Sequence, residues 1–289
     1  MGKPMALNLL RKGYSVTVHD ISESKVAELV QAGASPGDCC AEIASRCDII
    51  ILMLPDGPDV EVAVLGSEGI LEDANPGSVV VDMSSISPVI SKKVGAACEV
   101  AGLDFLDAPV SGGQPRAADG TLAIMVGGKP HVFARVLPVL EALGSMVTLT
   151  GPIGAGNVTK LANQIMVACN IAAMGEALVL AARAGLDPAI VFHAVRGGLA
   201  GSNVLNAKAP MVLSRNFQPG FRISLHQKDL RNALSMAESM DVALPLTSLV
   251  QQALIVLTNQ GKGNLDHSAI VMFTERMANL EVANALASV

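Results

Sequence analysis

The feature that most constrains the fold is a change of rhythm near residue 151. Before it, short runs rich in Val, Ile and Leu alternate with helical stretches, and after it no convincing strand occurs. The runs are mostly continuous rather than alternating, which is typical of strands with helices on both sheet faces. The sequence therefore predicts an α/β unit with a largely parallel, doubly wound sheet, followed by an all-helical unit.

The predicted strands cover 15–19, 48–54, 78–82, 104–107, 122–126 and 146–149. In the first half, helices are predicted over 4–12, 25–32 and 91–101, and each is followed by a glycine, which ends a helix without a Cβ penalty. In the second half, one long helix over 154–184 is followed by helices over 188–196, 208–214, 225–239, 245–260 and 268–281. We place the two domains at 1–152 and 153–289.

Composition excludes several classes of protein. Hydrophobic residues make up 51% and charged residues 16%, which excludes a disordered chain. The net charge of −6 and the lack of a basic run argue against a nucleic-acid partner. The long apolar helix carries Asn170 and Glu176 in mid-segment, so we expect a core helix packed on most sides rather than a membrane span. The start of the chain does not have the pattern of a secretory signal peptide.

Cysteines and histidines do not suggest a metal site. The five cysteines form no CxxC pair, so we expect free thiols in a reducing cytoplasm rather than disulfides or zinc ligands. The five histidines lie far apart along the sequence, which argues against both a metal centre and a Ser-His-Asp triad.

Residues near the start fit part of a dinucleotide site. Gly2 comes just before the first predicted helix, and the next strand ends at His19-Asp20. In a dinucleotide-binding βαβ unit, a glycine lets the helix pack on the sheet, and an acidic residue after the second strand binds the ribose hydroxyls. Asp20 would also repel a 2′-phosphate, which favours NAD over NADP. An ordinary helix-start glycine and a solvated strand end are the alternative interpretations.

Two further strand ends point to the same edge of the sheet. Leu54 and Pro55 follow one apolar strand, and Ser85 follows another. In open α/β sheets ligands bind outside the carboxyl ends of the strands, so these residues are candidate cofactor contacts. Ser85 is equally well placed as the N-cap of a helix that begins near Pro88.

The segment Ser111-Gly112-Gly113 follows the predicted strand 104–107. Successive backbone N–H groups of Ser111, Gly112 and Gly113 suit a small anion such as a substrate carboxylate, because glycine permits the required dihedrals. A plain glycine-rich turn is the alternative interpretation.

The start of the long helix is more informative. Glycines there permit the close approach of another chain segment or a ligand. Lys160 lies in the first turns, with Asn163 and Gln164 on the same face. Burial of such a lysine would lower its pKa and suit it to general acid–base work, and the two amides would orient a substrate. A lysine that extends to solvent is the alternative.

In the second half, Lys228 is a candidate for reaching a cleft between the domains, with Asp229 to hold it, and Phe221 is a candidate for packing on a planar ring. An ion-paired surface lysine and a core phenylalanine are equally compatible with the sequence.

Five segments together resemble the β-hydroxyacid dehydrogenase family, which includes 3-hydroxyisobutyrate dehydrogenase. They are MGKPMALNL at the start, LDAPVSGG at 106–113, GTLAIMVGG at 120–128, GAGNVTKLANQ at 154–164 and KDL at 228–230. The resemblance covers essentially the whole chain. It implies a Rossmann-like domain, a long interdomain helix and an all-helical domain that builds homodimers or homotetramers.

The resemblance also implies an activity and a set of roles. The activity is the NADH-dependent, reversible reduction of a small carboxylated aldehyde to a hydroxyacid, without a metal. The catalytic lysine matches Lys160, and the substrate-binding motifs match Ser111, Gly112, Gly113 and Asn163. Positions near the nicotinamide match Ser85 and Lys228.

One departure from the family concerns the cofactor. The opening strand and the GLGxM turn are absent, and Met1-Gly2 matches only the tail of that fingerprint. We expect either an earlier start to the chain, or an incomplete pyrophosphate site and a sheet that lacks a central strand. Two other functions stay open: a sister dehydrogenase for 3-hydroxyisobutyrate, and a non-catalytic nucleotide-binding scaffold.

Overall fold

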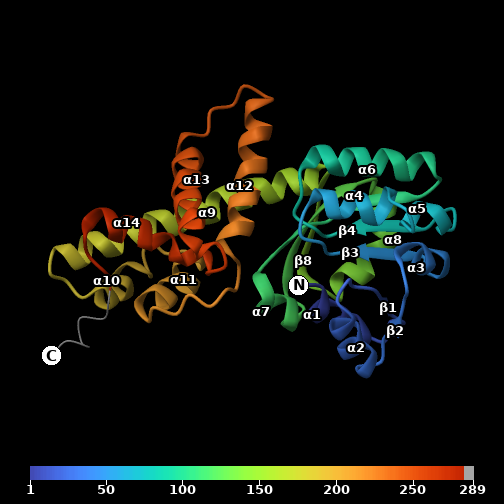
Figure 1. The fold of residues 1–289 in the computed structure, drawn as a ribbon, viewed down its shortest axis with the longest axis horizontal. Coiled ribbons are helices and arrows are strands. Elements are labelled where there is room, and N and C mark those ends of the chain that lie inside the picture. Colours follow the sequence, from blue (N-terminus) through green and yellow to red (C-terminus); the bar gives the residue numbers. More distant parts are fainter. Residues whose placement is uncertain (283–289) are drawn as a thin grey trace. The chain divides into compact units, whose positions relative to one another are not determined.

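The computed structural model describes residues 1–282, and its contacts divide the chain into two compact units after Lys160 (Figure 1). The first unit is α/β and the second is helical, as the sequence predicts. The long helix α9 (Ala155–Arg183) begins in the first unit and continues into the second. The domain boundary expected at 152/153 precedes α9, whereas the first residues of the helix group with the α/β unit.

A six-stranded sheet forms the centre of the first unit. Strands β3 (Ile49–Leu52), β4 (Val79–Asp82), β5 (Asp104–Asp107) and β7 (Leu122–Gly128) follow one another, and β6 (Val110–Ser111) and β8 (Gly144–Gly151) both pair with β7. The pairs β3–β4, β4–β5 and β7–β8 are parallel, but β7 is antiparallel to β5 and to β6. The sheet is therefore mixed rather than wholly parallel. The sequence did not predict β6, which has only two residues.

A second, two-stranded sheet precedes it. Strand β1 (Thr17–Val18) pairs in parallel with β2 (Ser35–Pro36), between helices α1 (Gly2–Arg11), α2 (Glu23–Gln31) and α3 (Cys40–Arg46). The sequence did not predict β2, because a Ser-Pro pair is typical of turns. Within residues 1–282 no strand joins β1 to β3, so the β-structure is split into two sheets.

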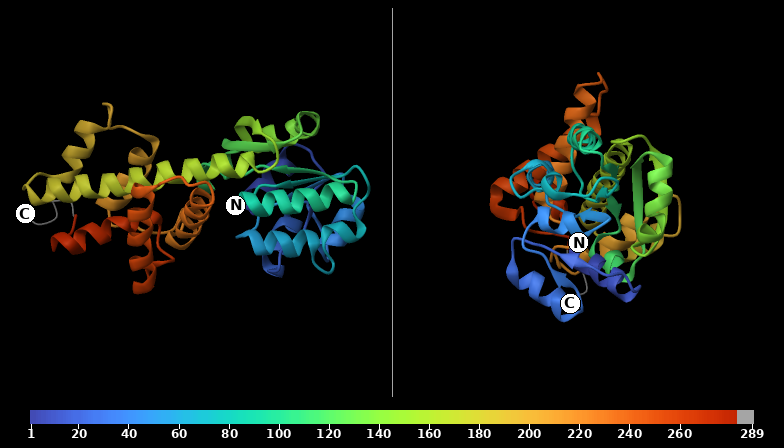
Figure 2. Two further views of the ribbon diagram at one scale, coloured as in Figure 1. Left: turned by 90° about the horizontal axis from the view of Figure 1, so that it is seen from above. Right: turned by 90° about the vertical axis from the view of Figure 1, so that its right-hand side faces the viewer.

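Helices cover both faces of the six-stranded sheet (Figure 1). Alternating residues of β4 divide between two cores: Val79 and Val81 face one, and Val80 faces the other. The first core is closed by α1, α7 (Gly113–Asp119) and α8 (Pro130–Glu141). The second is closed by α3, α4 (Gly57–Leu65), α5 (Ile70–Asp73) and α6 (Pro88–Val100), and α4 lies beside α6 (Figure 2).

The second unit packs shorter helices around α9. They are α10 (Pro188–Val195), α11 (Asn203–Leu213), α12 (Ile223–Glu238), α13 (Pro245–Leu257) with a π-helical turn η1 (Thr258–Lys262), the 3₁₀ turn η2 (His267–Ile270) and α14 (Val271–Ala278). Helix α11 begins five residues before the predicted position because the hydroxyl of Ser202 accepts a hydrogen bond from the backbone N–H of Leu205 (2.9 Å).

Helix α9 is less covered than its composition predicts. It is long and apolar enough to cross a membrane, and 39% of its most apolar window is buried. Ile171 and Leu178 lie in the core, whereas Met166 and Leu180 are exposed. The expectation that α9 is packed on most sides is wrong for the single chain. One such helix is weak evidence for a membrane span, since core helices of soluble proteins have the same length and composition.

Candidate active site

Asp20 lies just beyond β1, and its carboxylate is engaged locally. One oxygen accepts a hydrogen bond from the backbone N–H of Ser22 (2.9 Å), and the Lys25 ammonium lies 3.4 Å away. Both partners belong to the start of α2, so Asp20 connects the end of β1 to that helix. Gly2 begins α1, and a Cβ built on it would meet Met53 at an ordinary contact distance of 3.7 Å. Met1, ahead of it, is exposed.

The ends of β3 and β4 are joined by a serine. The Ser84 hydroxyl accepts a hydrogen bond from the backbone N–H of Leu54 (2.9 Å), which holds Leu54 and the exposed Pro55 beside the turn that carries Ser85. The N-cap of α6 is Ser87, whose hydroxyl accepts from the backbone N–H of Val89, so the interpretation of Ser85 as the cap is wrong. These candidate cofactor residues therefore lie on neighbouring strand ends.

The end of β5 carries a fully buried carboxyl group, that of Asp107, which is not among the candidate site residues predicted from the sequence. One oxygen of Asp107 accepts the backbone N–H of Gly154 (2.6 Å), and the other accepts the backbone N–H of Asn157 (2.8 Å). Both donors belong to the start of α9, where N–H groups lack intrahelical partners. Asp107 thus fixes the beginning of the helix that carries Lys160.

Burial raises the pKa of Asp107 to about 7; the hydrogen bonds from Asn157 and Gly154 oppose this shift, and the nearby Asp82 adds to it. Asp82 is the register partner of Asp107 on β4 and is also fully buried. Two carboxyl groups therefore lie on neighbouring strand ends, and that of Asp107 contacts the start of α9. The signal that the sequence offered was an acidic residue at the end of each of two apolar strands.

Two glycines let α9 approach the sheet. A Cβ on Gly156 would lie 2.4 Å from the carbonyl oxygen of Met125 and 2.5 Å from that of Asp107. A Cβ on Gly127 would lie 2.4 Å from the carboxylate of Asp107. Gly127 and Gly156 thus permit the close approach to the start of α9 that the sequence suggested. The segments that lie against the helix are β5 and β7 of the same chain.

Asn157 connects the first turns of α9 to the turn after β4. Its side-chain oxygen accepts the backbone N–H of Ile86 (3.1 Å), and its amide donates to the Ser91 hydroxyl (3.0 Å). Ile86 directly follows Ser85. Lys160 comes three residues after Asn157 on the same helix and is only 6% exposed. Ser85 and the turn that bears Lys160 are therefore tied together within the first unit.

The Ser111–Gly113 segment turns from β6 into α7 through two glycines with positive φ. Gly112 has φ 137° and Gly113 has φ 69°. A Cβ on Gly112 would lie 2.6 Å from the Arg116 side chain, so this turn requires glycine on both steric and dihedral grounds. Gly112 is exposed, and Ser111 and Gly113 are half-buried.

In the second unit, Gln164 and Lys228 both contact the carboxylate of Asp229. The Gln164 amide donates to the Asp229 carboxylate (2.6 Å), and the Lys228 ammonium lies 3.3 Å from the other oxygen of Asp229. Gln164 is 4% exposed, so its amide acts within the helical unit, where α9 meets α12. Asn163 is half-buried.

Phe221 packs edge-on against two histidines. Its ring centroid lies 5.7 Å from that of His226 and 5.3 Å from that of His267. Phe221 itself is half-buried. Sequence spacing had separated the histidines, and the tertiary structure brings two of them together.

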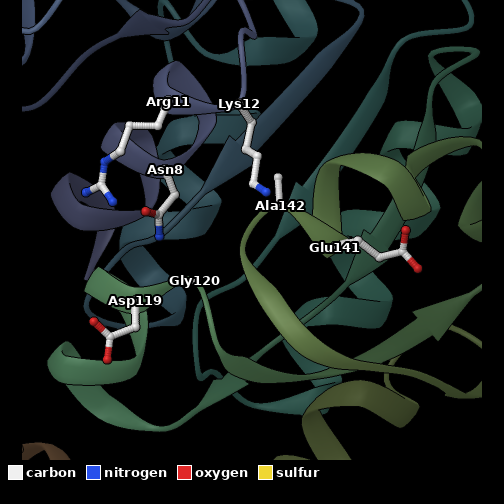
Figure 3. A pocket seen from close by; sticks show the side chains of 7 residues that line it. All are labelled: Asn8, Arg11, Lys12, Asp119, Gly120, Glu141 and Ala142. Carbon is white, nitrogen blue, oxygen red and sulfur yellow. The ribbon is translucent and has the colours of Figure 1, made fainter.

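A polar cavity of about 280 Å³ lies elsewhere in the first unit (Figure 3). Its lining comes from the carboxyl-terminal ends of α1, α7 and α8, including Arg11, Asp119 and Glu141. It contains none of the predicted site residues, and it lies at the end of α1 opposite Gly2. In residues 1–282 no group of three or more His, Cys, Asp or Glu side chains is arranged to hold a metal ion.

Comparison with known families agrees with this architecture. The NAD binding domain of 6-phosphogluconate dehydrogenase matches residues 1–151, and the NAD-binding domain of NADP-dependent 3-hydroxyisobutyrate dehydrogenase matches 154–274. The 2-hydroxy-3-oxopropionate reductase of Escherichia coli K12 is 44% identical over 98% of this chain and 97% of its own length. The 3-hydroxyisobutyrate dehydrogenase of Pseudomonas aeruginosa is 37% identical over 87% of each chain.

Solved structures show the same fold. The 3-hydroxyisobutyrate dehydrogenase of Mycobacterium tuberculosis superposes with a TM-score of 0.87 at 30% identity, covering 95% of both chains. That of Salmonella typhimurium gives 0.86 at 30% identity, covering 94% of this chain and 95% of the other. Fold and sequence thus define an NAD(P)-dependent dehydrogenase that acts on a CH–OH group. Within that class, the chain belongs to the 3-hydroxyisobutyrate dehydrogenase family.

Replacing Asp107 with Asn tests the buried carboxyl group. Because its folded-state pKa is raised from 3.8 to about 7, the folded protein holds this proton more tightly than the unfolded chain. The free energy of unfolding should therefore fall as the pH rises from about 4 to 7, by on the order of a few kcal/mol. Asp107→Asn should lose this part of the pH dependence in urea unfolding.

Asp104→Asn is the matched control, since Asp104 lies at the other end of β5 and pairs with Arg135. It should keep the wild-type pH profile. An Asp107→Asn profile that also coincides with wild type would refute the raised pKa.

Proposed function

We propose that the protein reduces tartronate semialdehyde (2-hydroxy-3-oxopropanoate) to D-glycerate with NADH, reversibly. The observation that carries the proposal is the 44% identity to a 2-hydroxy-3-oxopropionate reductase along nearly the whole of both chains. Four segments resemble that enzyme: GGLAGSNVL (197–205), KAPMV (208–212), RNFQPGFRISLHQKDL (215–230) and DHSA (266–269). The substrate is thus a small carboxylated aldehyde.

The first unit fits a dinucleotide along the carboxyl ends of its strands. Asp20 offers a carboxylate for ribose hydroxyls, and Met1 and Gly2 bring backbone to the start of α1, where N–H groups lack partners. Leu54, Pro55 and Ser85 line the ends of β3 and β4. We propose Lys228 as a cofactor contact because of the family resemblance, and Phe221 because its ring can pack against a planar ring of the cofactor. We propose NAD rather than NADP, since Asp20 disfavours a 2′-phosphate.

In the proposed mechanism, backbone N–H groups of Ser111, Gly112 and Gly113 bind the substrate carboxylate. Asn163, which matches the substrate-binding motif of the family, and Gln164 are proposed to orient the substrate. NADH, when bound, supplies the hydride. Lys160, as ammonium, donates a proton to the aldehyde oxygen, which becomes the hydroxyl of the product. In the reverse direction the neutral amine of Lys160 takes that proton back. The low exposure of Lys160 supports this role. Little water reaches a buried ammonium group, so water competes little with it as the proton donor.

A second candidate is oxidation of 3-hydroxyisobutyrate. The 37% identity to the P. aeruginosa enzyme over 87% of both chains supports it. Both reactions would use Lys160 and the Ser111–Gly113 segment in the same roles. They differ in the part of the substrate beyond the carboxylate.

We further propose that the enzyme is a cytoplasmic homodimer or homotetramer built through the helical unit. The large apolar side chains exposed on that unit support an interface between copies: they include Met166, Leu180, Ile190, Leu246 and Leu249. The five cysteines are all free, which suits a reducing compartment.

The substrate is tested by NADH oxidation, followed at saturating cofactor. We expect tartronate semialdehyde to give a kcat/KM at least about tenfold above that of methylmalonate semialdehyde, the aldehyde counterpart of 3-hydroxyisobutyrate. The reverse order would favour the second candidate. NADH binding without turnover of either aldehyde would favour a nucleotide-binding scaffold.

Lys160→Ala tests the proton donor. Loss of general acid catalysis should lower kcat by about 10²- to 10⁴-fold, while NADH binding, measured by fluorescence titration, should change little. Lys12→Ala, at the exposed end of α1, is the control and should keep wild-type kcat. Near-normal turnover of Lys160→Ala would reject the assigned role.

Asp20→Ala tests cofactor choice. Loss of a charged acceptor for the ribose hydroxyls should raise the KM for NADH about tenfold or more and reduce the preference over NADPH. Asp73→Ala, at an exposed position at the end of α5, should leave both KM values unchanged. An unchanged NADH:NADPH preference in Asp20→Ala would show that Asp20 only holds α2.

A further inference from the structure

Two buried imidazoles in the helical unit meet nitrogen to nitrogen. His226, on α12, and His267, at the start of η2, are 1% and 5% exposed, and their Nδ1 atoms lie 2.9 Å apart. The ring centroids are 4.9 Å apart, and Phe221 packs edge-on against both rings. The proposed mechanism makes no use of this pair.

The geometry restricts how many protons the pair can hold. The Nε2 of His226 lies 3.1 Å from the carbonyl oxygen of Gln164, which can only accept, so Nε2 carries a hydrogen. Between the two Nδ1 atoms one nitrogen must donate and the other accept. The pair therefore holds one shared proton, whether it is neutral or singly charged. A second positive charge would put two N–H groups face to face and break the contact.

Carboxylates and ammonium groups on the neighbouring elements set the charge around the pair. Asp266, next to His267, receives the Lys208 ammonium at both oxygens (3.0 Å) and three backbone N–H groups, those of Gly220, Phe221 and Ser268. Burial acts to raise the pKa of Asp266, but the positive charges of His267 and Lys208 more than offset it, so the pKa is lowered.

Asp229, three residues after His226 on α12, is paired with Lys228 and accepts a hydrogen bond from the Gln164 amide. Two carboxylates are thus balanced by two ammonium groups. This surrounding tolerates one positive charge on the imidazole pair, but two charges on rings this close and this buried repel each other strongly.

The pair reaches the catalytic helix through Gln164. In an α-helix the N–H of Gln164 bonds the carbonyl of Lys160, so the two residues are successive turns of one hydrogen-bonded column. His226 holds the backbone carbonyl of Gln164, and Asp229 holds its side chain. The turn of α9 that follows Lys160 is therefore fixed at two points in the helical unit.

We propose that His226 and His267 are positioning residues that hold the turn of α9 bearing Lys160. A second positive charge on the pair breaks the contact between the two Nδ1 atoms and releases that turn. The rate of the reduction therefore decreases in acid. This inference rests on the proposed function of Lys160. Because two positive charges on rings this close repel each other, the pair takes up its second proton only in acid.

The pH profile of kcat separates this role from that of Lys160. In the reduction, Lys160 acts as an ammonium, so acid does not remove the proton donor. We nevertheless expect kcat to decrease when the pH is lowered below about 6, because the imidazole pair takes up a second proton. The rates are measured as initial rates, which limits the acid decay of NADH.

Two substitutions at one position provide the test. His267→Asn keeps a donor near the Nδ1 position but does not titrate, so we expect near-wild-type kcat at pH 7.5 and no fall in acid. His267→Phe keeps the volume but lacks the donor, so we expect kcat about 3- to 10-fold lower at pH 7.5, unchanged KM for NADH and no acid limb. His193→Asn, on the exposed face of α10, should keep the wild-type profile.

An acid limb that persists in His267→Asn, or wild-type kcat in His267→Phe, would overturn the proposal. Histidine ¹⁵N NMR of the wild-type protein gives a readout that does not depend on activity: one shared Nδ1 proton near pH 7.5 and loss of that signal below about pH 6. Two independently titrating rings would overturn the pair itself. A wild type that reduces neither aldehyde but shows the shared proton would instead overturn the proposed function.

Discussion

The structure of the α/β unit depends on one buried carboxyl group. Asp107 ends β5 and accepts the backbone N–H groups of Gly154 and Asn157, so it satisfies donors that the start of α9 cannot satisfy itself. Burial disfavours the charged form of Asp107, whereas the hydrogen bonds and the dipole at the N-terminal end of α9 favour it. Lys160, the candidate catalytic residue, lies on α9, so Asp107 fixes the start of the helix that carries it.

Close packing around this carboxyl group explains why glycine recurs in the segments that carry the family resemblance. Gly127 and Gly156 lie where any Cβ would overlap a backbone carbonyl or the Asp107 carboxylate. The glycines thus place α9 directly on β5 and β7, and Asn157 then ties the helix to the turn after β4. A site built on strand ends and a helix start is held more precisely than one built on loops alone.

The helical unit combines an apolar core with a polar centre. Aliphatic side chains of α9 to α14 form one core, within which Asp266, His267, His226, Gln164 and Asp229 are connected through short polar contacts. Buried polar groups of this kind are costly unless each is satisfied, so they specify one arrangement of α9, α12 and η2. The apolar side chains left exposed on the same unit have no such restriction, and they suit contacts with another copy of the chain.

The sequence by itself determined the two-part architecture, the long helix and the residues at strand ends, because periodicity, capping glycines and apolar runs are local properties. It also singled out Lys160, Ser111–Gly113 and Ser85 as candidates. Only the tertiary structure decided that β7 runs antiparallel to β5, that Asp107 holds the start of α9, and that Phe221 packs on imidazoles. The histidine pair was invisible to sequence reasoning, because 41 residues separate His226 from His267 and only helix packing brings them within hydrogen-bonding distance.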